Sequence, residues 1–337
     1  MRQLTCVRPG VCEWLEVAEP QIQGGKEALV HPVFVARCDV DLPMLRGQTP
    51  IPMPIALGHE FIAEILELGD EVAGLRRGQL VVVPFQISCG ECDRCRRGVT
   101  NSCASVPLRS QYGFGAFGGN WGAALSDRVR VPFAEGMLVP VPDGVEPAAI
   151  ASADNLCDGW RTVGPYLQES PEVSVLVVGG GAQSVGLYAA AIASALGASR
   201  VDYVDDDAER LALAESVGAN PLEAPPPKRL GPYRVTVDAS ANPVGLACAL
   251  RSVEPGGVCT SVGIYFAEET PVPLLEMYTT GVTLVTGRVN ARTCLPHVLD
   301  LVKSGRLHPE VLTTRIASWE EAADAFLDPS PKVLITR

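Results

Sequence analysis

Positive charge is scarce in this sequence. Its 337 residues include 27 Lys and Arg against 39 Asp and Glu, which gives a formal net charge of −12. No Lys/Arg-rich cluster is interleaved with aromatic residues, and an acidic field repels polyanions, so nucleic acid and anionic membranes are poor partners. The N-terminal run MRQLTCVRPG has no apolar targeting segment, and no internal repeat or low-complexity segment appears. The sequence favours a cytoplasmic protein whose partner is a small molecule.

Chain length and cysteine content indicate the number of domains and the redox environment of the protein. A chain of 337 residues exceeds what one core comfortably serves, so we expect two domains. Its eleven cysteines are an odd number in a chain without a targeting segment, which is typical of a reduced, cytosolic protein. Free Cys is among the most buried residue types, so we expect most of those outside any metal site to be small core residues: Cys6, Cys12, Cys157, Cys248, Cys259 and Cys294.

Four cysteines are spaced for one tetrahedral metal ion. The run C-G-E-C-D-R-C-R-R-G-V-T-N-S-C holds Cys89, Cys92, Cys95 and Cys103. Four thiolates fill the coordination sphere of Zn²⁺ and leave no position for substrate. The sequence therefore predicts a structural zinc site, with its excess negative charge offset by the neighbouring Arg94, Arg96 and Arg97.

Residues 173 to 199 contain no charged residue and are long enough to span a bilayer. Their glycines indicate a different structure. We expect a buried parallel strand at 173–178, a tight turn at Gly179-Gly180-Gly181, and a helix over 184–196 that ends at Gly197. A second strand at 200–204 and a helix at 208–217 complete a βαβ unit.

Asp205 follows the second strand of this unit, 24 residues after Gly181. Such a turn brings a helix N-terminus to a pyrophosphate, and the acid accepts hydrogen bonds from the adenosine ribose. The same carboxylate repels a 2′-phosphate, so NAD is favoured over NADP, and Asp206 and Asp207 add to the repulsion. The middle glycine of G-x-G-x-x-G is replaced by Gln183, whose side chain must turn aside or bind a phosphate oxygen. The predicted cofactor contacts are Gly179, Gly181, Gln183, Ser184, Val185, Gly186, Asp205, Arg210 and Arg288.

The rest of the chain shows two different patterns of predicted secondary structure. Strands at 234–238, 257–264 and 282–286 and a helix at 244–253 continue the strand and helix alternation, with 221–228 as a Pro-rich surface connection. Before residue 150, short strands at 28–35, 61–68 and 79–84 lie between Gly and Pro, which indicates a mostly β domain. The tail has helical patterns at 295–303 and 319–327 and a closing strand at 332–336. We predict an α/β protein with a Rossmann-type domain at 150–287 and a second domain formed by 1–149 and 288–337.

Cys38, the run Gly58-His59-Glu60 and Asp154 form a second possible metal set. A thiolate, a neutral imidazole and a carboxylate balance Zn²⁺ and leave a fourth position for water or a substrate oxygen. Spacing alone does not establish this site, because an isolated His is more often a core or surface residue than a ligand.

The order of these motifs resembles that of zinc-dependent alcohol dehydrogenases of the medium-chain dehydrogenase/reductase superfamily, over essentially the whole chain. The resemblance implies a GroES-like catalytic domain beside a doubly wound Rossmann domain, two zinc ions per chain, NAD, and a homodimer or homotetramer. It implies that Cys38, His59 and Asp154 bind the catalytic zinc, with Cys157 as a competing third ligand. It also gives a role at the catalytic zinc to Glu60, places Asp41 behind the ligands, and puts Leu57 and Phe85 in the substrate pocket.

Three positions depart from the family pattern. Val40 stands where a Ser or Thr usually relays the alcohol proton, Pro43 stands where some relatives have a relay His, and Asp158 replaces a Thr on the nicotinamide side. Asp158, Asp39 or a water chain then takes the relay role, or the substrate needs no alcohol proton removed. The loop at 111–121 shapes the pocket, with Tyr112 and Trp121 either lining it or simply packing.

Three functions therefore compete. The first is an NAD-dependent alcohol dehydrogenase or carbonyl reductase, acting on a secondary or aromatic alcohol. The second is a reductase of activated C=C or C=N bonds on the same scaffold, which the absent relay favours. The third is a dinucleotide-binding protein without catalysis.

Overall fold

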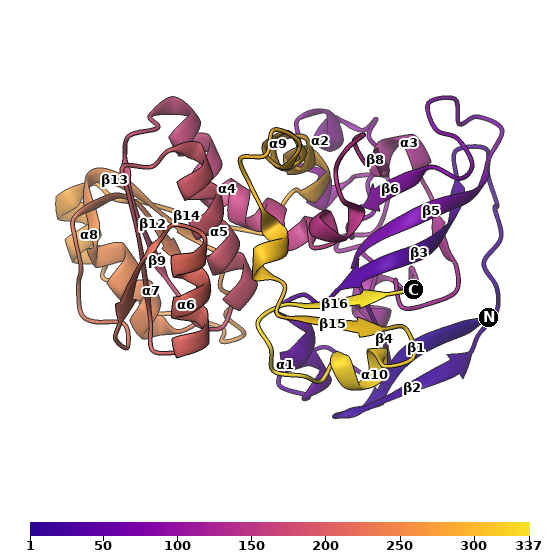
Figure 1. Ribbon diagram of the computed structural model, residues 1–337, viewed down its shortest axis with the longest axis horizontal. Helices are drawn as coiled ribbons and strands as arrows, with labels where there is room; N and C mark the ends of the chain where they lie inside the picture. The colour runs from indigo at the N-terminus through magenta and orange to yellow at the C-terminus, as the bar shows by residue number, and fades with distance from the viewer. The chain divides into compact units, whose positions relative to one another are not determined.

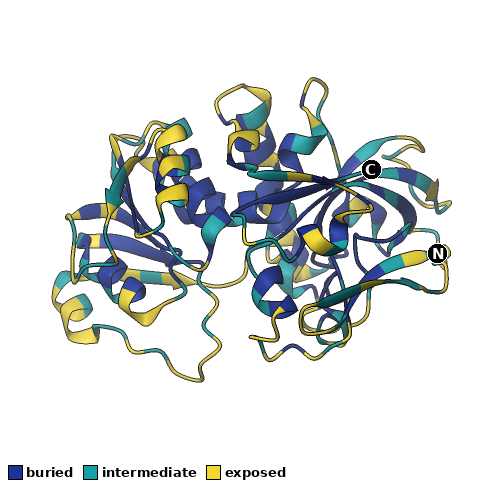
Figure 2. Cartoon of the chain, turned by 60° about the horizontal axis from the view of Figure 1, so that its bottom comes forward, coloured by how far each residue is buried: buried dark blue, intermediate teal, exposed yellow.

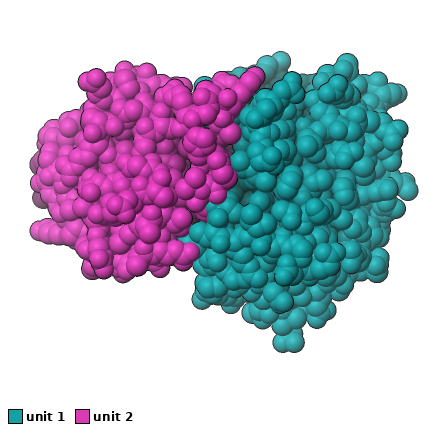
Figure 3. Space-filling model, viewed as in Figure 1, with its two compact units in different colours: residues 1–154, 290–299, 313–337 teal, residues 155–289, 300–312 magenta.

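The computed structural model describes residues 1–337 and divides them into two compact units, coloured separately in Figure 3. The first unit comprises residues 1–154, 290–299 and 313–337, and the second comprises residues 155–289 and 300–312. These bounds differ from the predicted ones mainly at residues 300–312, which group with the second unit.

The second unit contains a six-stranded sheet in which every neighbouring pair is parallel. The strand order is β11-β10-β9-β12-β13-β14. The chain winds outward from β9 to β11 and then returns to the other side of β9 at β12, so the winding direction switches between β9 and β12. In such a sheet, ligands bind outside the carboxyl ends of the strands at the switch. The strands are β9 (Ser174–Val178), β10 (Arg200–Asp205), β11 (Asn220–Glu223), β12 (Tyr233–Asp238), β13 (Val253–Ser261) and β14 (Thr283–Thr286).

Helices alternate with these strands, as the sequence predicted. They are α4 (Ala153–Glu169), α5 (Gln183–Leu196), α6 (Ala208–Ser216), α7 (Pro243–Arg251) and α8 (Leu274–Thr280). Figure 2 shows the central strands of this sheet, β9, β10, β12 and β13, mostly in the dark blue of buried residues and the outer helix faces exposed. Several boundaries differ from the prediction. Part of the predicted connection at 221–228 forms the edge strand β11, where Pro221 is tolerated because an edge needs no further donor. Strand β13 begins four residues earlier and ends three residues earlier than expected, and α7 ends two residues earlier.

The first unit is mostly β, as predicted. Its larger sheet has the order β15-β16-β3-β5-β6-β8, with β7 paired to β3, and its smaller sheet has the order β2-β1-β4. The strands are β1 (Arg2–Arg8), β2 (Val11–Glu16), β3 (Ala28–Ala36), β4 (Ile55–Ala56), β5 (Glu60–Leu68), β6 (Leu80–Val83), β7 (Val129–Val131), β8 (Val139–Pro140), β15 (Arg315–Ser318) and β16 (Val333–Thr336).

Short helices and turns connect these strands. They are α1 (Asp41–Leu45), α2 (Asp93–Arg96), α3 (Ala134–Met137), α10 (Ala322–Ala325), and the 3₁₀ turns η1 (Thr100–Ser102), η2 (Gly115–Gly118) and η3 (Pro147–Ile150). Helix α9 (Ala291–Lys303) begins in this unit and ends in the second, to which the 3₁₀ turn η4 (Pro309–Leu312) also belongs. The predicted helix at 319–327 is only the four residues of α10. The closing strand β16 pairs antiparallel with β3, so the C-terminal segment does return to the first unit (Figure 1). None of the helices combines the length and apolar character needed to cross a bilayer.

Candidate functional site

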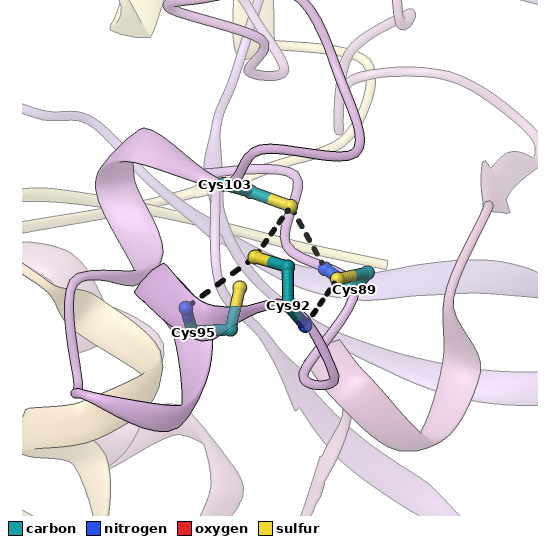
Figure 4. Close-up of side chains that lie close together, drawn as sticks. All are labelled: Cys89, Cys92, Cys95 and Cys103. Carbon is teal, nitrogen blue, oxygen red and sulfur yellow. Dashed lines mark hydrogen bonds between the residues drawn. The ribbon is translucent and has the colours of Figure 1, made fainter.

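The four predicted zinc cysteines come together in the first unit. The sulfur atoms of Cys89, Cys92, Cys95 and Cys103 all lie within 4.8 Å of one another. Figure 4 shows the four sulfurs turned toward a common centre, with Cys92 capping the N-terminus of the short helix α2, Cys95 within it and Cys103 directly after η1. Four sulfur donors around one point are the arrangement of a structural zinc site.

Hydrogen bonds favour the thiolate form of Cys89 and Cys92, whereas burial raises the pKa of the Cys95 thiol. Cys89 Sγ accepts from the N–H of Cys92 at 3.3 Å and from Ser105 Oγ at 3.2 Å. Burial opposes ionisation of Cys89, but these hydrogen bonds outweigh it and hold the pKa of this thiol below its usual value. The N–H groups of Ala104 and Cys95 lower the pKa of Cys92 to about 6. The loop is therefore prepared for a cation before one binds, and the residues fit zinc.

The cysteine loop is anchored to two other parts of the first unit. A Cβ on Gly136 of α3 would lie 2.5 Å from the carbonyl oxygen of Cys89, so the two backbones are in direct contact. Near α9, the N–H of Asn101 donates to Asn290 Oδ1 at 3.0 Å, and Thr293 Oγ1 donates to the Gly98 carbonyl at 3.0 Å. A metal here would stabilise the attachment of residues 290–293 to the sheet.

The second predicted metal set is organised by a buried carboxylate. Cys38 lies two residues beyond the end of β3, and His59 lies one residue before β5, at neighbouring strand ends because Ala36 pairs with Glu60. Asp41, in the first turn of α1, accepts the backbone N–H of Cys38 on Oδ2 at 2.9 Å. Its other oxygen lies 3.4 Å from His59 Nδ1. Asp41 therefore links the Cys38 loop to His59.

Burial sets the protonation states in this cluster. It lowers the pKa of His59 to about 4, which keeps the imidazole neutral. It also raises the pKa of the Cys38 thiol well above its usual value, and the carboxylates of Glu60, Asp41 and Asp39 raise it further. Asp41 itself has a pKa raised to about 7 by burial, although the N–H of Cys38 opposes the rise.

These residues fit a bound zinc ion. A metal-ligating His donates its second ring N–H to a carboxylate in most proteins, and the Nδ1 and Asp41 Oδ1 atoms face each other with no other hydrogen-bond partner. This arrangement leaves Nε2 of His59 for a metal.

Glu60 pairs with a lysine that no sequence pattern marks as a site residue. Lys332 Nζ donates to Glu60 Oε2 at 2.7 Å and to the carbonyl oxygen of Arg37 at 2.9 Å, and both charged side chains are buried. Arg37 in turn donates to the carbonyls of Asp328 and Ser330. Lys332 precedes β16, so only the pairing of β16 with β3 brings it to this site.

Three predicted site residues lie on α4. Asp154 is buried in the first turn of α4 and is the last residue of the first unit's main segment, and Cys157 is buried one turn later. Asp158 forms an ion pair with Arg161, whose guanidinium also donates to the Ser261 carbonyl at 3.3 Å. The carboxylate of Asp158 is thus already balanced by a cation.

Aromatic rings cover His59. Phe85, a predicted pocket residue, has its ring centroid 5.5 Å from that of the imidazole, and Leu57 is buried nearby in the chain. Phe114 approaches more closely, at 4.9 Å, and was not predicted, although it lies in the loop at 111–121. Tyr112 of that loop is core instead, since it is fully buried and donates to the carbonyl of Arg130 at 2.9 Å.

The glycine turn of the second unit is packed too closely for side chains. A Cβ on Gly179 would lie 2.2 Å from Asp205 Oδ2, and one on Gly180, whose φ is +144°, would lie 2.8 Å from the Ser240 backbone. Gly186 packs against Ala239 of the strand end beyond β12, where a Cβ would come within 2.9 Å. Helix α5 begins at Gln183, one residue earlier than predicted, so this partly exposed side chain lies in the first turn. The carboxylate therefore lies directly against the turn, which fits a ribose and pyrophosphate site.

Asp205 is held on both oxygens by its own chain. Arg210 Nε lies 2.8 Å from Oδ2 and Arg210 Nη2 lies 2.6 Å from Oδ1. The N–H groups of Asp206 and Asp207 also donate to Oδ1. The two-pronged contact to Arg210, on α6, offsets the negative charge that was expected to repel a 2′-phosphate. Ser184 accepts from Asn155 Nδ2 at 2.6 Å, while Arg288 is exposed after β14.

Comparison with known proteins agrees with this architecture. Residues 24–143 match the family model "Alcohol dehydrogenase GroES-like domain", and residues 184–304 match "Zinc-binding dehydrogenase". The chain is 31% identical over 316 residues to the "Probable zinc-binding alcohol dehydrogenase Rv1895" of Mycobacterium tuberculosis, covering 91% of this chain and 80% of that protein. It is also 31% identical to a glutathione-independent formaldehyde dehydrogenase of Bacillus subtilis, over 88% of this chain and 80% of that protein.

Among solved structures, alcohol dehydrogenase TADH from Thermus sp. ATN1 superposes with a TM-score of 0.88 at 30% identity, covering 100% of this chain and 99% of that one. The fold, the four-cysteine cluster, the family models and the relatives lead to one assignment. The chain belongs to the zinc-dependent alcohol dehydrogenases of the medium-chain dehydrogenase/reductase superfamily.

Proposed function

We propose that the protein interconverts an alcohol and its carbonyl compound with NAD, using a catalytic zinc held by Cys38, His59 and Asp154. The observation that carries the proposal is the position of Asp41, which contacts both the Cys38 backbone and His59 Nδ1 in a buried setting. When bound, zinc would supply a Lewis acid for the substrate oxygen, and NAD would supply the hydride acceptor. A second zinc at the four-cysteine loop has a structural role.

The chain's own residues then have distinct tasks. Asp41 orients His59 and keeps its Nδ1 protonated, and the burial that keeps His59 uncharged preserves its second nitrogen as a donor to metal. Phe85 and Phe114 shield the imidazole from water and present apolar surface to the carbon part of a substrate. This lining favours secondary or aromatic alcohols.

Zinc content tests the proposal directly. Wild type is expected to hold two zinc ions per chain and Cys38→Ser one, with NADH formation lost over a panel of secondary and aromatic alcohols. Cys248→Ser, which replaces a buried cysteine of the second unit, is the matched control and should keep both. One zinc ion in both wild type and Cys38→Ser would contradict the catalytic site. Asp41→Asn should weaken zinc binding by about 10–100-fold while leaving the four-cysteine zinc in place.

A reductase of activated C=C or C=N bonds is the second candidate, because Val40 offers no hydroxyl for a proton relay at the start of α1. The ion pair between Asp158 and Arg161 also disfavours Asp158 as a substitute. Activity with enones and imines but with no alcohol would support this candidate.

NAD as the cofactor rests on Asp205, with Asp206 and Asp207 beside it. Because Arg210 is bound to Asp205, we expect Asp205→Ser to release the guanidinium for a 2′-phosphate and to shift kcat/KM toward NADP. The double variant Asp205→Ser/Arg210→Met should lose that gain. Equal NADP use by the two variants would contradict the role given to Arg210.

Self-association into a homodimer or homotetramer also stays a proposal. It is supported by exposed apolar side chains on the edge of the second unit, namely Leu274, Leu275 and Tyr278 of α8 and Val285 of β14. Light scattering would test it, with Val285→Lys expected to lower the measured mass.

A further inference from the structure

Three sulfur-containing residues gather at the smaller sheet of the first unit, and none of them belongs to either predicted zinc site. Cys6 on β1 lies directly opposite Cys12 on β2, and on its other side it pairs with Ile55 of β4, two residues after Met53. Cys6 Sγ lies 3.9 Å from Met53 Sδ and donates to the carbonyl oxygen of Arg8 at 3.2 Å. The proposed function uses none of the three.

The distance between the Cys6 and Met53 sulfur atoms suits two ligands of a single small ion. Sulfur atoms bonded at about 2.3 Å to one ion in a planar, three-coordinate arrangement lie about 4.0 Å apart. Two thiols and a thioether are soft donors, the class that selects Cu(I), whereas Zn²⁺, Mg²⁺ and Ca²⁺ favour sets with four or more donors or with oxygen. Cys6 is buried, but Cys12 and Met53 are partly exposed, which gives an ion a route in from solvent.

We propose that Cys6, Cys12 and Met53 form a binding site for a soft metal ion, with Cu(I) as the ion that the three sulfurs fit. Binding one Cu(I) replaces the two thiol protons with two Cu–S bonds and releases both protons, with no electron transferred. The product carries a net charge of −1.

A regulatory disulfide between the same two cysteines fits the structure less well. Its formation requires a thiolate, and burial together with the Cys6 thiol and Asp324 raises the pKa of Cys12 to about 12. A metal ion overcomes this barrier by bonding directly to the sulfurs as the protons leave, whereas a mild oxidant does not.

The test uses the zinc-loaded full chain, reduced and without oxygen, titrated with Cu(I) held by a competing chromogenic chelator. Wild type is expected to take up about one copper ion per chain while its zinc content stays constant. Cys12→Ser should weaken Cu(I) binding by more than about 100-fold, and Met53→Leu by at least about tenfold, because each removes a ligand. Cys294→Ser, a buried cysteine outside the three-sulfur cluster, is the matched control and should bind copper like wild type.

Three results would overturn the proposal. They are copper uptake unchanged in Cys12→Ser or Met53→Leu, copper that enters only as zinc leaves, and a Cys6–Cys12 disulfide found by mass spectrometry in place of bound metal. X-ray absorption on copper-loaded wild type needs no variant and covers the case in which a variant does not fold. It should give a first shell of three sulfurs, and a shell of four sulfurs or of nitrogen and oxygen would also overturn the proposal.

Discussion

Gly179→Ala is the sharpest test of the cofactor site. The backbone conformation of Gly179 is allowed for alanine, so any effect comes from the steric clash of the added methyl group. Gly179 has no left-handed φ, yet its Cβ would lie 2.2 Å from Asp205 Oδ2 and 2.7 Å from Tyr203 Oη. Ordinary contact begins near 3.4 Å, so the carboxylate must retreat by about 1.2 Å. That shift exceeds the tolerance of a hydrogen bond and moves Asp205 out of reach of a ribose hydroxyl.

The size of the effect follows from the bonds that are lost. A hydrogen bond to a charged group contributes about 1.5–3 kcal/mol, so NADH binding should weaken by about 10- to 150-fold. Overpacking against the buried ring of Tyr203 should also cost about 1–3 kcal/mol of unfolding free energy. Fluorescence titration with NADH and urea unfolding measure the two effects separately.

Two comparisons make this prediction refutable. Gly24→Ala is the control, since its Cβ would meet nothing closer than 3.9 Å and its φ is also not left-handed. In an Asp205→Gly background, Gly179→Ala should still reduce stability, because Tyr203 remains, but it should no longer weaken NADH binding. Unchanged NADH affinity in the Gly179→Ala single variant, or an equal loss with and without Asp205, would refute the reasoning.

Further predictions concern buried charge, the cysteine loop and acid stability. Lys332→Met should lower the unfolding free energy by about 3–5 kcal/mol, since it leaves Glu60 buried without its ammonium, and Lys332→Met/Glu60→Gln should recover most of that in urea unfolding. Cys103→Ser should lose one zinc per chain by elemental analysis and more than about 4 kcal/mol of stability; a full zinc complement would contradict the four-cysteine site. Burial would raise the pKa of Asp202, but hydrogen bonds from Arg200 and others outweigh it and hold that pKa below its usual value. The stabilisation is therefore present above about pH 4 and is lost as pH falls through the lower folded-state pKa, so Asp202→Asn should flatten the acid limb of stability, and an unchanged slope would count against this.

Most of the fold could be predicted from local sequence patterns. The charge-free run at 173–199 and the acid at 205 predicted β9, α5 and β10 to within a residue, because hydrophobic strands, glycine turns and an Ala-rich helix are encoded by neighbours in sequence. The four cysteines were predicted as one cluster for the same reason, since their ligand spacing is itself local. The helix expected at 319–327 is helical only over the four residues of α10, with turns on both sides of it.

Contacts between residues far apart in the chain could not be predicted from the sequence. Nothing near Lys332 in the chain marks it as a partner of Glu60, 272 residues away, and the register of β16 on β3 alone brings them together. Phe114 lay in a loop whose glycines permit many conformations, so the sequence could not say which of its aromatics faces His59. The Arg210 contact to Asp205 was missed for a different reason, since the acid was interpreted only through its expected ligand.

Charged groups around Cys38 control the ionisation of its thiol at the proposed catalytic site. Cys38 lies among the carboxylates of Glu60, Asp41 and Asp39, and each of them raises the cost of ionising its thiol. Lys332 is the nearby buried cation that lowers this cost, and it already neutralises Glu60. Ionised Cys38 would still face the carboxylates of Asp41 and Asp39, and a divalent cation would balance this charge while His59 stays neutral. We therefore expect the ionisation of Cys38 and the binding of a metal ion to depend on each other.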